Sequence, residues 1–454
     1  MSATATEEHY RQRSLWLDQI PGDLTPRPAL AGDIDCDAVV VGAGFTGLWT
    51  AYYLKTLQPD MRIVVVEREI AGFGPSGRNG GWASAGVAGA ASAYGLKDTD
   101  AEFVRGREAT EQAVDEIGRV IEAEGIDCGY NKQGCVMVAT TPPQRDRLSD
   151  HSVGDLLDPA AAAKHVHIPG VLAAMYSPHA ARIDPARAVR GLADACERHG
   201  ITIYEQTPAL EFGKGVVKCA QGTVRAEIVL GATESYTTQL PREKLRYLPL
   251  YSLMIATEPL PEPVWEELGW RDGLLVGDTH HLFFYAQRTT DGRIAIGGRG
   301  APYELKHPIS EQNEQSDAVK ARLLGALRRH FPAAADAAIT HHWGGPLAVP
   351  RDWSMSVAYD RDRGYGRAGG YTGHGVAASN VAGRTMADLV LGRETDLVTL
   401  PWVGHRSRRW EPEPLRYFAS RSIIRVLHDA DEHEDRTGQR SQLTRLVSPF
   451  MPPG

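Results

Sequence analysis

The chain has 454 residues, 42% of them hydrophobic, which is enough to bury a large core and predicts two domains rather than one. Its formal net charge of −8 argues against a nucleic-acid partner, because phosphate binding needs a positive surface. The five cysteines are scattered without a C-x-x-C pair, which indicates free thiols in a reducing compartment. The histidine spacing is not typical of a metal site, so no metal is expected.

The N-terminal residues show no targeting pattern. Residues 1–9 lack a basic region followed by an apolar core, so we expect no signal peptide. No run approaches the roughly 18 apolar residues of a membrane span, and we expect a cytoplasmic protein without a transmembrane segment. Residues 10–33, with prolines at 21, 26 and 28, are predicted to form an extended arm, and residues 1–33 are treated as one N-terminal arm.

Residues 37–67 follow the pattern of a dinucleotide-binding unit: an apolar strand (37–41), a glycine-rich turn, a helix (48–55) and a second strand (62–66). Gly42 permits the tight turn, Gly44 leaves room for a pyrophosphate, and Gly47 lets the helix pack closely. The helix N-terminus then faces the phosphate charge. Glu67 lies about twenty residues past Gly47, where an acid at a strand end accepts ribose hydroxyls.

A glycine-rich loop, residues 71–82, follows where an NAD domain would return through a helix to a third strand. Its residues suit close approach to a flat ligand. At this point the chain resembles the glycine/D-amino-acid oxidase family of FAD-dependent oxidoreductases, and most of all its gamma-glutamylputrescine oxidoreductase branch. The resemblance extends from about Leu30 to Gly392, and the residues that carry it are Gly42–Gly47, Glu67, Ser76–Gly81 and Gly373–Gly375.

This resemblance implies an α/β fold, with a Rossmann-like FAD-binding domain of the GR2/DAO type and a mixed-sheet substrate domain. The FAD-binding domain is expected to be discontinuous, made of residues 34–95, 180–245 and 340–395. The substrate domain is expected to comprise residues 96–179 and 246–339, followed by a C-terminal helical tail, 396–454.

The resemblance also implies the residues that hold FAD. The flavin is expected to be non-covalent, since Trp82 is followed by Ala83 rather than a tethering histidine, and the last cysteine is Cys219. For Ala232 and Thr233 a plain strand end is the alternative. The expected cofactor-binding residues are Gly42, Gly44, Phe45, Thr46, Gly47, Glu67, Arg68, Ser76, Arg78, Asn79, Gly80, Gly81, Ala209, Ala232, Thr233, Gly373, His374, Gly375 and Val376.

A second glycine-rich turn, residues 369–375, leads into a predicted helix, 376–391. In the family this turn brings the helix N-terminus beside the flavin N1–C2=O edge. A reduced flavin is negatively charged there, and free N–H groups at a helix start stabilise that charge. The alternative is an ordinary helix with a flexible entry. His374 is assigned to charge stabilisation and not to proton removal.

The catalytic candidates are His374, Trp82, Tyr285 and Tyr251, with Tyr371 as a further aromatic near the substrate. Aromatic side chains would supply apolar walls and cation–π attraction for an amine, although each is as easily an ordinary core residue. Arg288 and Arg299 could bind a substrate carboxylate, but arginines beside a hairpin are more often surface residues.

We therefore expect oxidation of a primary or secondary amine (an amino acid, an N-methyl amine or a polyamine derivative) to an imine, with oxygen as the acceptor. An amine is favoured over an alcohol because a hydroxyl needs a base to take its proton. One alternative is a dehydrogenase that passes electrons to a quinone or another carrier. A reductase using NAD(P)H would want a second G-x-G-x-x-G between a strand and a helix, and this alternative is not favoured. A redox sensor or scaffold is the non-enzymatic alternative.

The tail after Gly392 is expected to form a helix with an apolar side and an arginine side. Packing on the parent domain is favoured, a homodimer contact comes second and an interfacial membrane helix third. Mixed charges over 429–434 speak against the membrane. The apolar side is Leu415, Phe418, Ala419, Ile423, Val426 and Leu427, and the other side is Arg416, Arg421 and Arg425.

Overall fold

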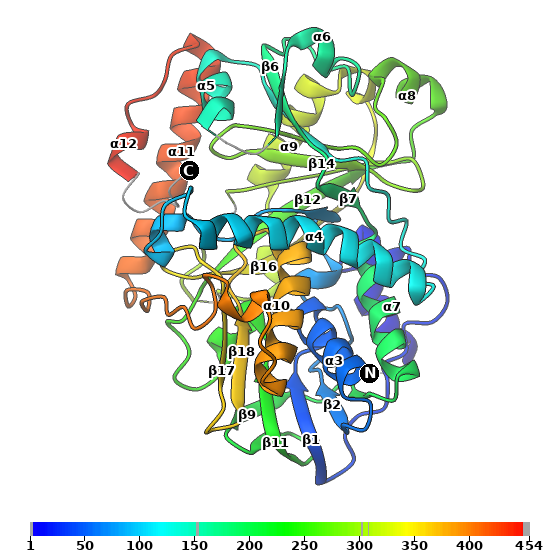
Figure 1. Cartoon of the computed structure of the whole chain (residues 1–454). Helices are drawn as coiled ribbons and strands as arrows, with labels where there is room; N and C mark the ends of the chain where they lie inside the picture. Colours follow the sequence, from blue (N-terminus) through cyan, green and yellow to red (C-terminus); the bar gives the residue numbers. More distant parts are fainter. Residues whose placement is uncertain (1–2, 151–153, 301–302, 307, 448–454) are drawn as a thin grey trace.

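Two eight-stranded sheets organise the computed structural model, which describes residues 3–150, 154–300, 303–306 and 308–447 (Figure 1). The first sheet has the order β17-β18-β11-β1-β2-β8, and the strands β10 and β9 extend from β11. Its strands are β1 (Ile34–Val41), β2 (Ile63–Val66), β8 (Thr202–Tyr204), β9 (Ala209–Gly213), β10 (Val216–Cys219), β11 (Thr223–Gly231), β17 (Ser356–Asp360) and β18 (Tyr365–Gly369).

The centre of the first sheet is parallel, with β1 between β2 and β11. Val40 and Val65 pack toward helices on one face, while Val39 and Val64 pack toward β9 and β10 on the other. Strands covered on both faces need continuous apolar, β-branched runs, which β1 and β2 supply. The helices are α3 (Phe45–Leu57), α4 (Ala101–Ala123), α7 (Pro185–Arg198) and α10 (Gly375–Leu391). The expected Rossmann-like half is therefore confirmed.

The second sheet has the order β16-β12-β15-β14-β13-β4-β6-β5 and is mixed, because β13 pairs in parallel with β4. One face packs under α9 (Asp317–His330). The other face carries Met254, Ala256 and Trp343 toward the N-terminal segment and the first half. The strands are β4 (Cys135–Ala139), β5 (Asp155–Leu157), β6 (Ala173–Ser177), β12 (Leu248–Thr257), β13 (Leu275–Asp278), β14 (Phe284–Arg288), β15 (Ile294–Gly298) and β16 (Ile339–Val349).

Two elements lie outside the domain to which the sequence pattern assigned them. Helix α4 packs on the first half with α3 and α10, because its stripe of Val114, Ile117 and Ile121 meets that core. Strand β16 pairs along β12, so residues 339–349 complete the second sheet. Between the sheets, β3 (Trp82–Ser84) pairs with β7 (Ala180–Arg182).

The predicted extended arm at residues 10–33 is wrong in its first half. Residues Ala3–Arg11 form α1 and Leu15–Asp18 form α2, where the Ser14 hydroxyl accepts a hydrogen bond from the Leu17 N–H at 3.1 Å. Tyr10 and Trp16 are 1% exposed, because the segment buries its large apolar side chains against both halves of the molecule. The prolines shape only the irregular stretch that follows.

The tail forms α11 (Leu415–Thr437) and α12 (Thr444–Val447), and α11 runs beside α5 (Pro142–Asp150) in Figure 1. The expected faces are partly reversed: Leu415 and Phe418 are each 63% exposed, whereas Arg416 is buried. The rest of the expected apolar face does pack, since Leu427 is buried against Leu282 with Ile423 and Val426 beside it. Acidic side chains add further contacts. Asp431 accepts the N–H groups of His281 and Leu282, each at 2.9 Å, and Glu434 pairs with Arg147 at 2.8 Å.

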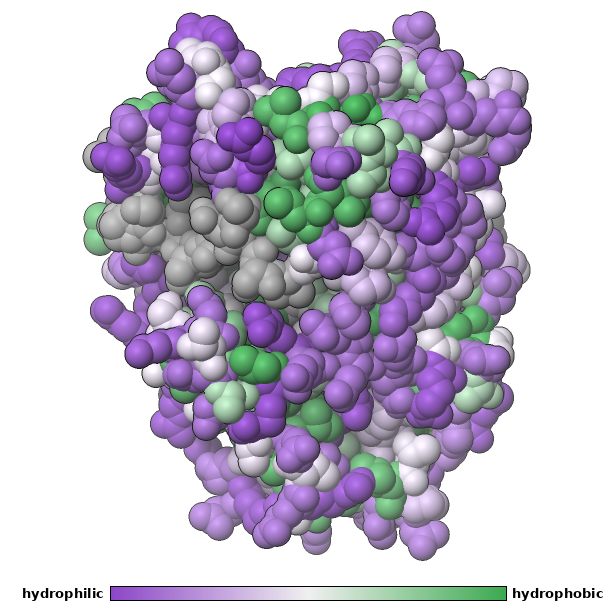
Figure 2. All heavy atoms as spheres, turned by 45° about the horizontal axis from the view of Figure 1, so that its top comes forward, coloured by the Kyte–Doolittle hydropathy of each residue, from purple (hydrophilic) through white to green (hydrophobic). Residues whose placement is uncertain are grey.

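Among the described residues, no helix has both the length and the apolar character needed to cross a bilayer. Figure 2 shows one face covered mainly by hydrophilic side chains, with a hydrophobic patch beside the part drawn in grey. Two short helices, α6 (Pro159–Ala162) and α8 (Glu262–Leu268), lie at the end of the second sheet that is uppermost in Figure 1.

Candidate functional site

The turn between β1 and α3 needs glycine at two positions. Gly42 has a φ of +106°, and a Cβ there would lie 2.6 Å from the Ala232 carbonyl oxygen. A Cβ on Gly47 would lie 1.9 Å from the Gly42 carbonyl oxygen. The helix therefore starts against the strand end at a distance that only glycine permits. Ala232 and Thr233, at the end of β11, border the same turn, since the Ala232 N–H donates to the Val41 carbonyl at 2.9 Å.

The N-terminus of α3 is open to an anion. Its N-cap, Gly44, has no side chain to cap it, and the Phe45 N–H donates to Ser76 Oγ at 3.0 Å. The N–H groups of Gly44, Thr46 and Gly47 have no acceptor within the part of the chain that is described. Free N–H groups with the helix dipole behind them form an anion site, as the sequence pattern predicts for a pyrophosphate.

Glu67 follows the last residue of β2 and reaches back over the turn. Its carboxylate accepts the Ala43 N–H at 2.8 Å and the Glu69 N–H at 3.0 Å. Burial raises the pKa of Glu67, although these two hydrogen bonds act in the opposite direction. Arg68 turns away to Gln239 at 2.7 Å and over the Tyr236 ring at 4.7 Å. Ala209 begins β9, opposite Cys219 of β10.

The loop 75–81 is held by its own side chains and by β14. The Asn79 amide donates to the Pro75 and Ser76 carbonyls at 3.1 and 2.8 Å and accepts the Gly81 N–H at 2.8 Å. Gln287 donates to the Gly80 carbonyl at 2.6 Å. These hydrogen bonds hold the conformation of the loop without a ligand.

The Arg78 side chain makes contacts that the sequence pattern did not predict. Its guanidinium is fully buried, pairs with Glu314 at 2.7 Å and donates to the Tyr236 hydroxyl at 3.1 Å. It ties the loop to the segment after β15.

The second glycine-rich turn precedes α10 as expected. Gly373 has a φ of +113° with open space around its Cβ position, and His374 is the N-cap, with no side-chain cap bond. Beneath the turn, Glu234 accepts the Gly370 and Tyr371 N–H groups at 3.0 and 3.4 Å. Burial raises the pKa of Glu234 to about 7, against the effect of these bonds. Glu234 was not predicted from the sequence, because a single acidic residue after a strand belongs to no recognisable motif.

His374 lies where the small residues 83–95 pass. A Cβ on Gly86 would lie 3.1 Å from its Nδ1, so the run of alanine and glycine is needed for close packing here. The ring is accessible at the helix start but deep in the molecule. Desolvation, followed by the Arg299 charge, lowers the pKa of His374 to about 4, and the imidazole is neutral at pH 7.

Three predicted residues meet on the face of the second sheet that is turned to the first half. The Trp82 and Tyr285 rings lie edge to face at 6.2 Å, and the Tyr285 hydroxyl bonds to Ser252 Oγ at 2.6 Å. Arg299 stacks over Phe283 at 4.5 Å. Burial lowers the pKa of Arg299 to about 10, although Tyr285 acts to raise it. Arg299 has no acidic partner among the described residues.

Three other candidates lie elsewhere. Tyr251 points to the α9 face of β12, with Leu253 and Ile255, and its hydroxyl donates to the Ser310 carbonyl at 3.1 Å. Arg288 stacks on Trp265 at 4.3 Å. Tyr371 is 4% exposed and bonds Thr46 Oγ1 at 2.9 Å, so it joins the two helix starts instead of lining a substrate position.

The residues present fit FAD. Two helix N-termini, each with first-turn N–H groups that have no acceptor among the described residues, and a carboxylate at the end of β2 match the charges and donors of a pyrophosphate, a ribose and a flavin edge. The residues that would hold it are the β1–α3 turn, Glu67, the loop 75–81 and the turn before α10.

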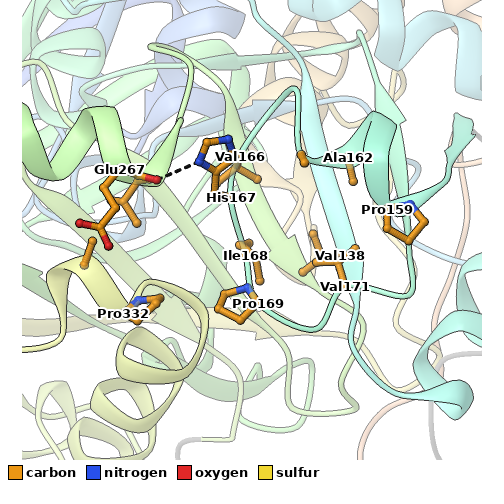
Figure 3. A pocket seen from close by; sticks show the side chains of 13 residues that line it. Val138, Pro159, Ala162, Val166, His167, Ile168, Pro169, Val171, Glu267 and Pro332 are labelled. Atoms are coloured by element: carbon orange, nitrogen blue, oxygen red, sulfur yellow. Dashed lines mark hydrogen bonds between the residues drawn. The ribbon is translucent and has the colours of Figure 1, made fainter.

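An apolar cavity of about 330 Å³ lies apart from these residues, between α6, α8 and the segment after α9. Figure 3 shows Val138, Val166, Ile168 and Val171 around it, and His167 Nδ1 bonded to the Glu267 carbonyl at 2.8 Å. None of the predicted site residues lines it.

Comparison with known proteins matches most of the chain to one family. Residues 37–389 match the family model described as FAD dependent oxidoreductase (DAO). The probable oxidoreductase OrdL of Haemophilus influenzae is 28% identical over 416 residues, which cover 87% of this chain and 91% of that protein. The gamma-glutamylputrescine oxidoreductase of Escherichia coli is 29% identical over 386 residues, which cover 81% of this chain and 86% of that protein.

Solved structures share the fold. Glycine oxidase from Geobacillus kaustophilus has a TM-score of 0.64 at 20% identity, covering 80% of this chain and 96% of that one. L-proline dehydrogenase from P. horikoshii has a TM-score of 0.64 at 20% identity, covering 83% of this chain and 98% of that one.

Proposed function

Because the chain belongs to the DAO family of FAD-dependent oxidoreductases, we propose that it oxidises a small amine that carries a carboxylate to the corresponding imine. The observation that supports this substrate class is Arg299, a partly buried guanidinium without an acidic partner in the described residues. A charge held away from water is costly unless an anion accompanies it. A substrate carboxylate would be that anion.

The neighbours of Arg299 support an amine next to that carboxylate. Trp82 and Tyr285 present aromatic rings, which attract ammonium groups and wall off water. A guanidinium holds a carboxylate in a fixed orientation by paired hydrogen bonds, and the rings then limit where the amine can lie. Among the relatives, the E. coli protein is named gamma-glutamylputrescine oxidoreductase, after an amine derivative.

No general base is required of this chain. FAD, when bound, supplies hydride acceptance from a carbon next to nitrogen. The nitrogen lone pair assists the departure of hydride, provided the amine is neutral. His374 has a pKa of about 4, so it is neutral over the working range and adds no charge that would repel an ammonium group. The rate of flavin reduction should therefore rise with pH as the substrate loses its proton and then level off.

We further propose oxygen as the electron acceptor, with a quinone or another carrier as the alternative. Anaerobic reduction of the flavin followed by admission of air separates them. Rapid reoxidation with stoichiometric hydrogen peroxide supports an oxidase, whereas slow reoxidation in air and fast reoxidation by a quinone supports the alternative.

The substrate class is tested by anaerobic stopped-flow bleaching of the bound flavin. The panel comprises amino acids, N-methyl amines and polyamines with and without a carboxylate, and hydroxy acids. We expect carboxylated amines to bleach the flavin fastest at low concentration. Bleaching by hydroxy acids alone would overturn the amine assignment, and equal bleaching by amines without a carboxylate would overturn the role of Arg299.

A further inference from the structure

The N-terminal segment contacts the cofactor loop directly. The indole N–H of Trp16 donates to the Asn79 carbonyl at 2.8 Å, and the indole N–H of Trp343 donates to the Arg78 carbonyl at 3.0 Å. The two indoles are 1% and 2% exposed and lie edge to face at 6.1 Å. Two successive carbonyls of the loop 75–81 are therefore held by a pair of tryptophans, one of them from a segment outside both sheets.

Holding these carbonyls fixes the opposite edge of each peptide. A trans peptide is planar, so its N–H points away from its C=O. The carbonyl of Arg78 belongs to the same peptide as the Asn79 N–H, and the carbonyl of Asn79 to the same peptide as the Gly80 N–H. Neither N–H has an acceptor in the part of the chain described. The tryptophans thus turn two free donors to the side of the loop away from themselves.

The same segment holds the loop at a second point. Arg13 pairs with Glu311 at 2.7 Å and with Glu314 at 3.4 Å, and Glu314 also pairs with the buried Arg78 at 2.7 Å. Near the other end of the cradle, the Tyr10 hydroxyl donates to Glu69 at 3.3 Å, two residues past Glu67. The segment therefore makes polar contacts near the loop 75–81 and near Glu67. Covering apolar surface alone would not require such contacts.

We propose that residues 10–17, here named the N-terminal clamp, form part of the FAD-holding machinery. Trp16 and Trp343 are positioning residues that aim the Asn79 and Gly80 N–H groups, and Arg13 positions Arg78 through Glu314. The inference rests on FAD binding and not on the identity of the amine, so it stands or falls independently of the proposed substrate.

The test is Trp16→Phe, which keeps a large apolar ring and removes the N–H. Apoprotein is titrated with FAD, and the dissociation constant and the visible spectrum of the bound flavin are measured. We expect the constant to rise about 5- to 20-fold, as loss of one buried hydrogen bond in a preorganised loop predicts, with a shifted flavin absorbance band. The unfolding midpoint of the apoprotein is recorded in parallel.

Trp270→Phe is the matched control. Trp270 is 2% exposed, and its indole N–H donates to the Leu274 carbonyl at 2.9 Å within the second domain. It should lower the unfolding midpoint by a similar amount and change the FAD dissociation constant less than twofold. Equal weakening by both variants would reduce the role of Trp16 to general stability and overturn the proposal.

A second variant, Arg13→Gln, tests the other contact without emptying a core position. We expect a severalfold weaker FAD complex with little change in the unfolding midpoint of the apoprotein. If Trp16→Phe does not fold, this variant decides the question, and unchanged FAD affinity in Arg13→Gln would then overturn the proposal. Unchanged affinity in a folded Trp16→Phe overturns it as well.

Discussion

The cofactor side and the substrate side of this molecule are built by different means. On the cofactor side, the site is formed by glycines, by helix N-termini and by loop carbonyls that accept hydrogen bonds from tryptophans. Most of its groups therefore belong to the backbone. On the substrate side, Tyr285 projects from β14, Arg299 follows directly after β15, and Trp82 of β3 packs against Tyr285. A site made of backbone groups uses residues that are close in sequence, so it can be recognised as a motif. A site made of side chains from paired strands uses residues far apart in sequence, so no motif marks it.

The largest expected effect breaks the backbone site. Gly47→Ala would place a Cβ 1.9 Å from the Gly42 carbonyl oxygen. Because that oxygen belongs to the backbone, the clash can be relieved only by moving the strand end or the helix. We expect loss of FAD binding and of most folded protein, measured as the flavin-to-protein ratio after purification. Gly325→Ala is the control, because Gly325 lies within α9 with nothing near its Cβ position; it should stabilise the chain by about 1 kcal/mol.

The same division explains what the sequence alone could predict. The β1–α3–β2 unit and the turn before α10 follow from glycine spacing and apolar runs, and both are present with nearly the expected bounds. Tyr251 and Tyr285 are equally aromatic in the sequence, yet strand alternation turns only Tyr285 toward the first half. That choice depends on register, which a single sequence does not reveal.

The N-terminal segment shows another limit. Trp16 lies among residues that look like a proline-containing arm, and its partner Asn79 is 63 residues away. No local pattern announces a hydrogen bond at that separation. The one signal in the sequence is the run of three apolar residues, Leu15, Trp16 and Leu17, all of which are buried in the structure.

The next prediction concerns pH and the turn that carries His374. Burial raises the pKa of Glu234 from 4.5 to about 7, so the folded chain keeps a proton that the unfolded chain releases between these values. The stability that Glu234 contributes is therefore full below pH 4.5 and is lost as the pH rises through 7, a change of roughly 3 kcal/mol.

Glu234→Gln should remove that loss while its amide oxygen still accepts the Gly370 N–H. Urea unfolding at pH 5 and pH 8 should then show a smaller difference in the free energy of unfolding than in wild type. An unchanged difference would mean that Glu234 does not titrate in this range. A change would show that a buried side chain also matters on the side of the molecule dominated by backbone.

A third prediction tests the substrate side. Arg299→Met keeps an apolar stem and removes the charge, so the concentration of carboxylated amine that half-saturates flavin reduction should rise about 10- to 100-fold. FAD affinity should stay within twofold, because Arg299 is not among the residues that we expect to hold FAD. Arg288→Met, which loses a guanidinium stacked on Trp265, is the control and should leave both quantities unchanged.

The smallest expected effect comes from Glu67, whose carboxylate is a side-chain contact within a site made mostly of backbone. Glu67→Gln keeps an oxygen for the Ala43 N–H, so the β1–α3 turn should stay intact, but one charged acceptor for a ribose hydroxyl is lost. Roughly 10-fold weaker FAD binding is expected, with an unchanged flavin spectrum, since the change lies at the adenosine end. The exposed Glu227→Ala on β11 serves as the control. If Glu67→Gln released FAD as completely as Gly47→Ala, side chains would dominate both halves, and the contrast between the two sides of the molecule would fail.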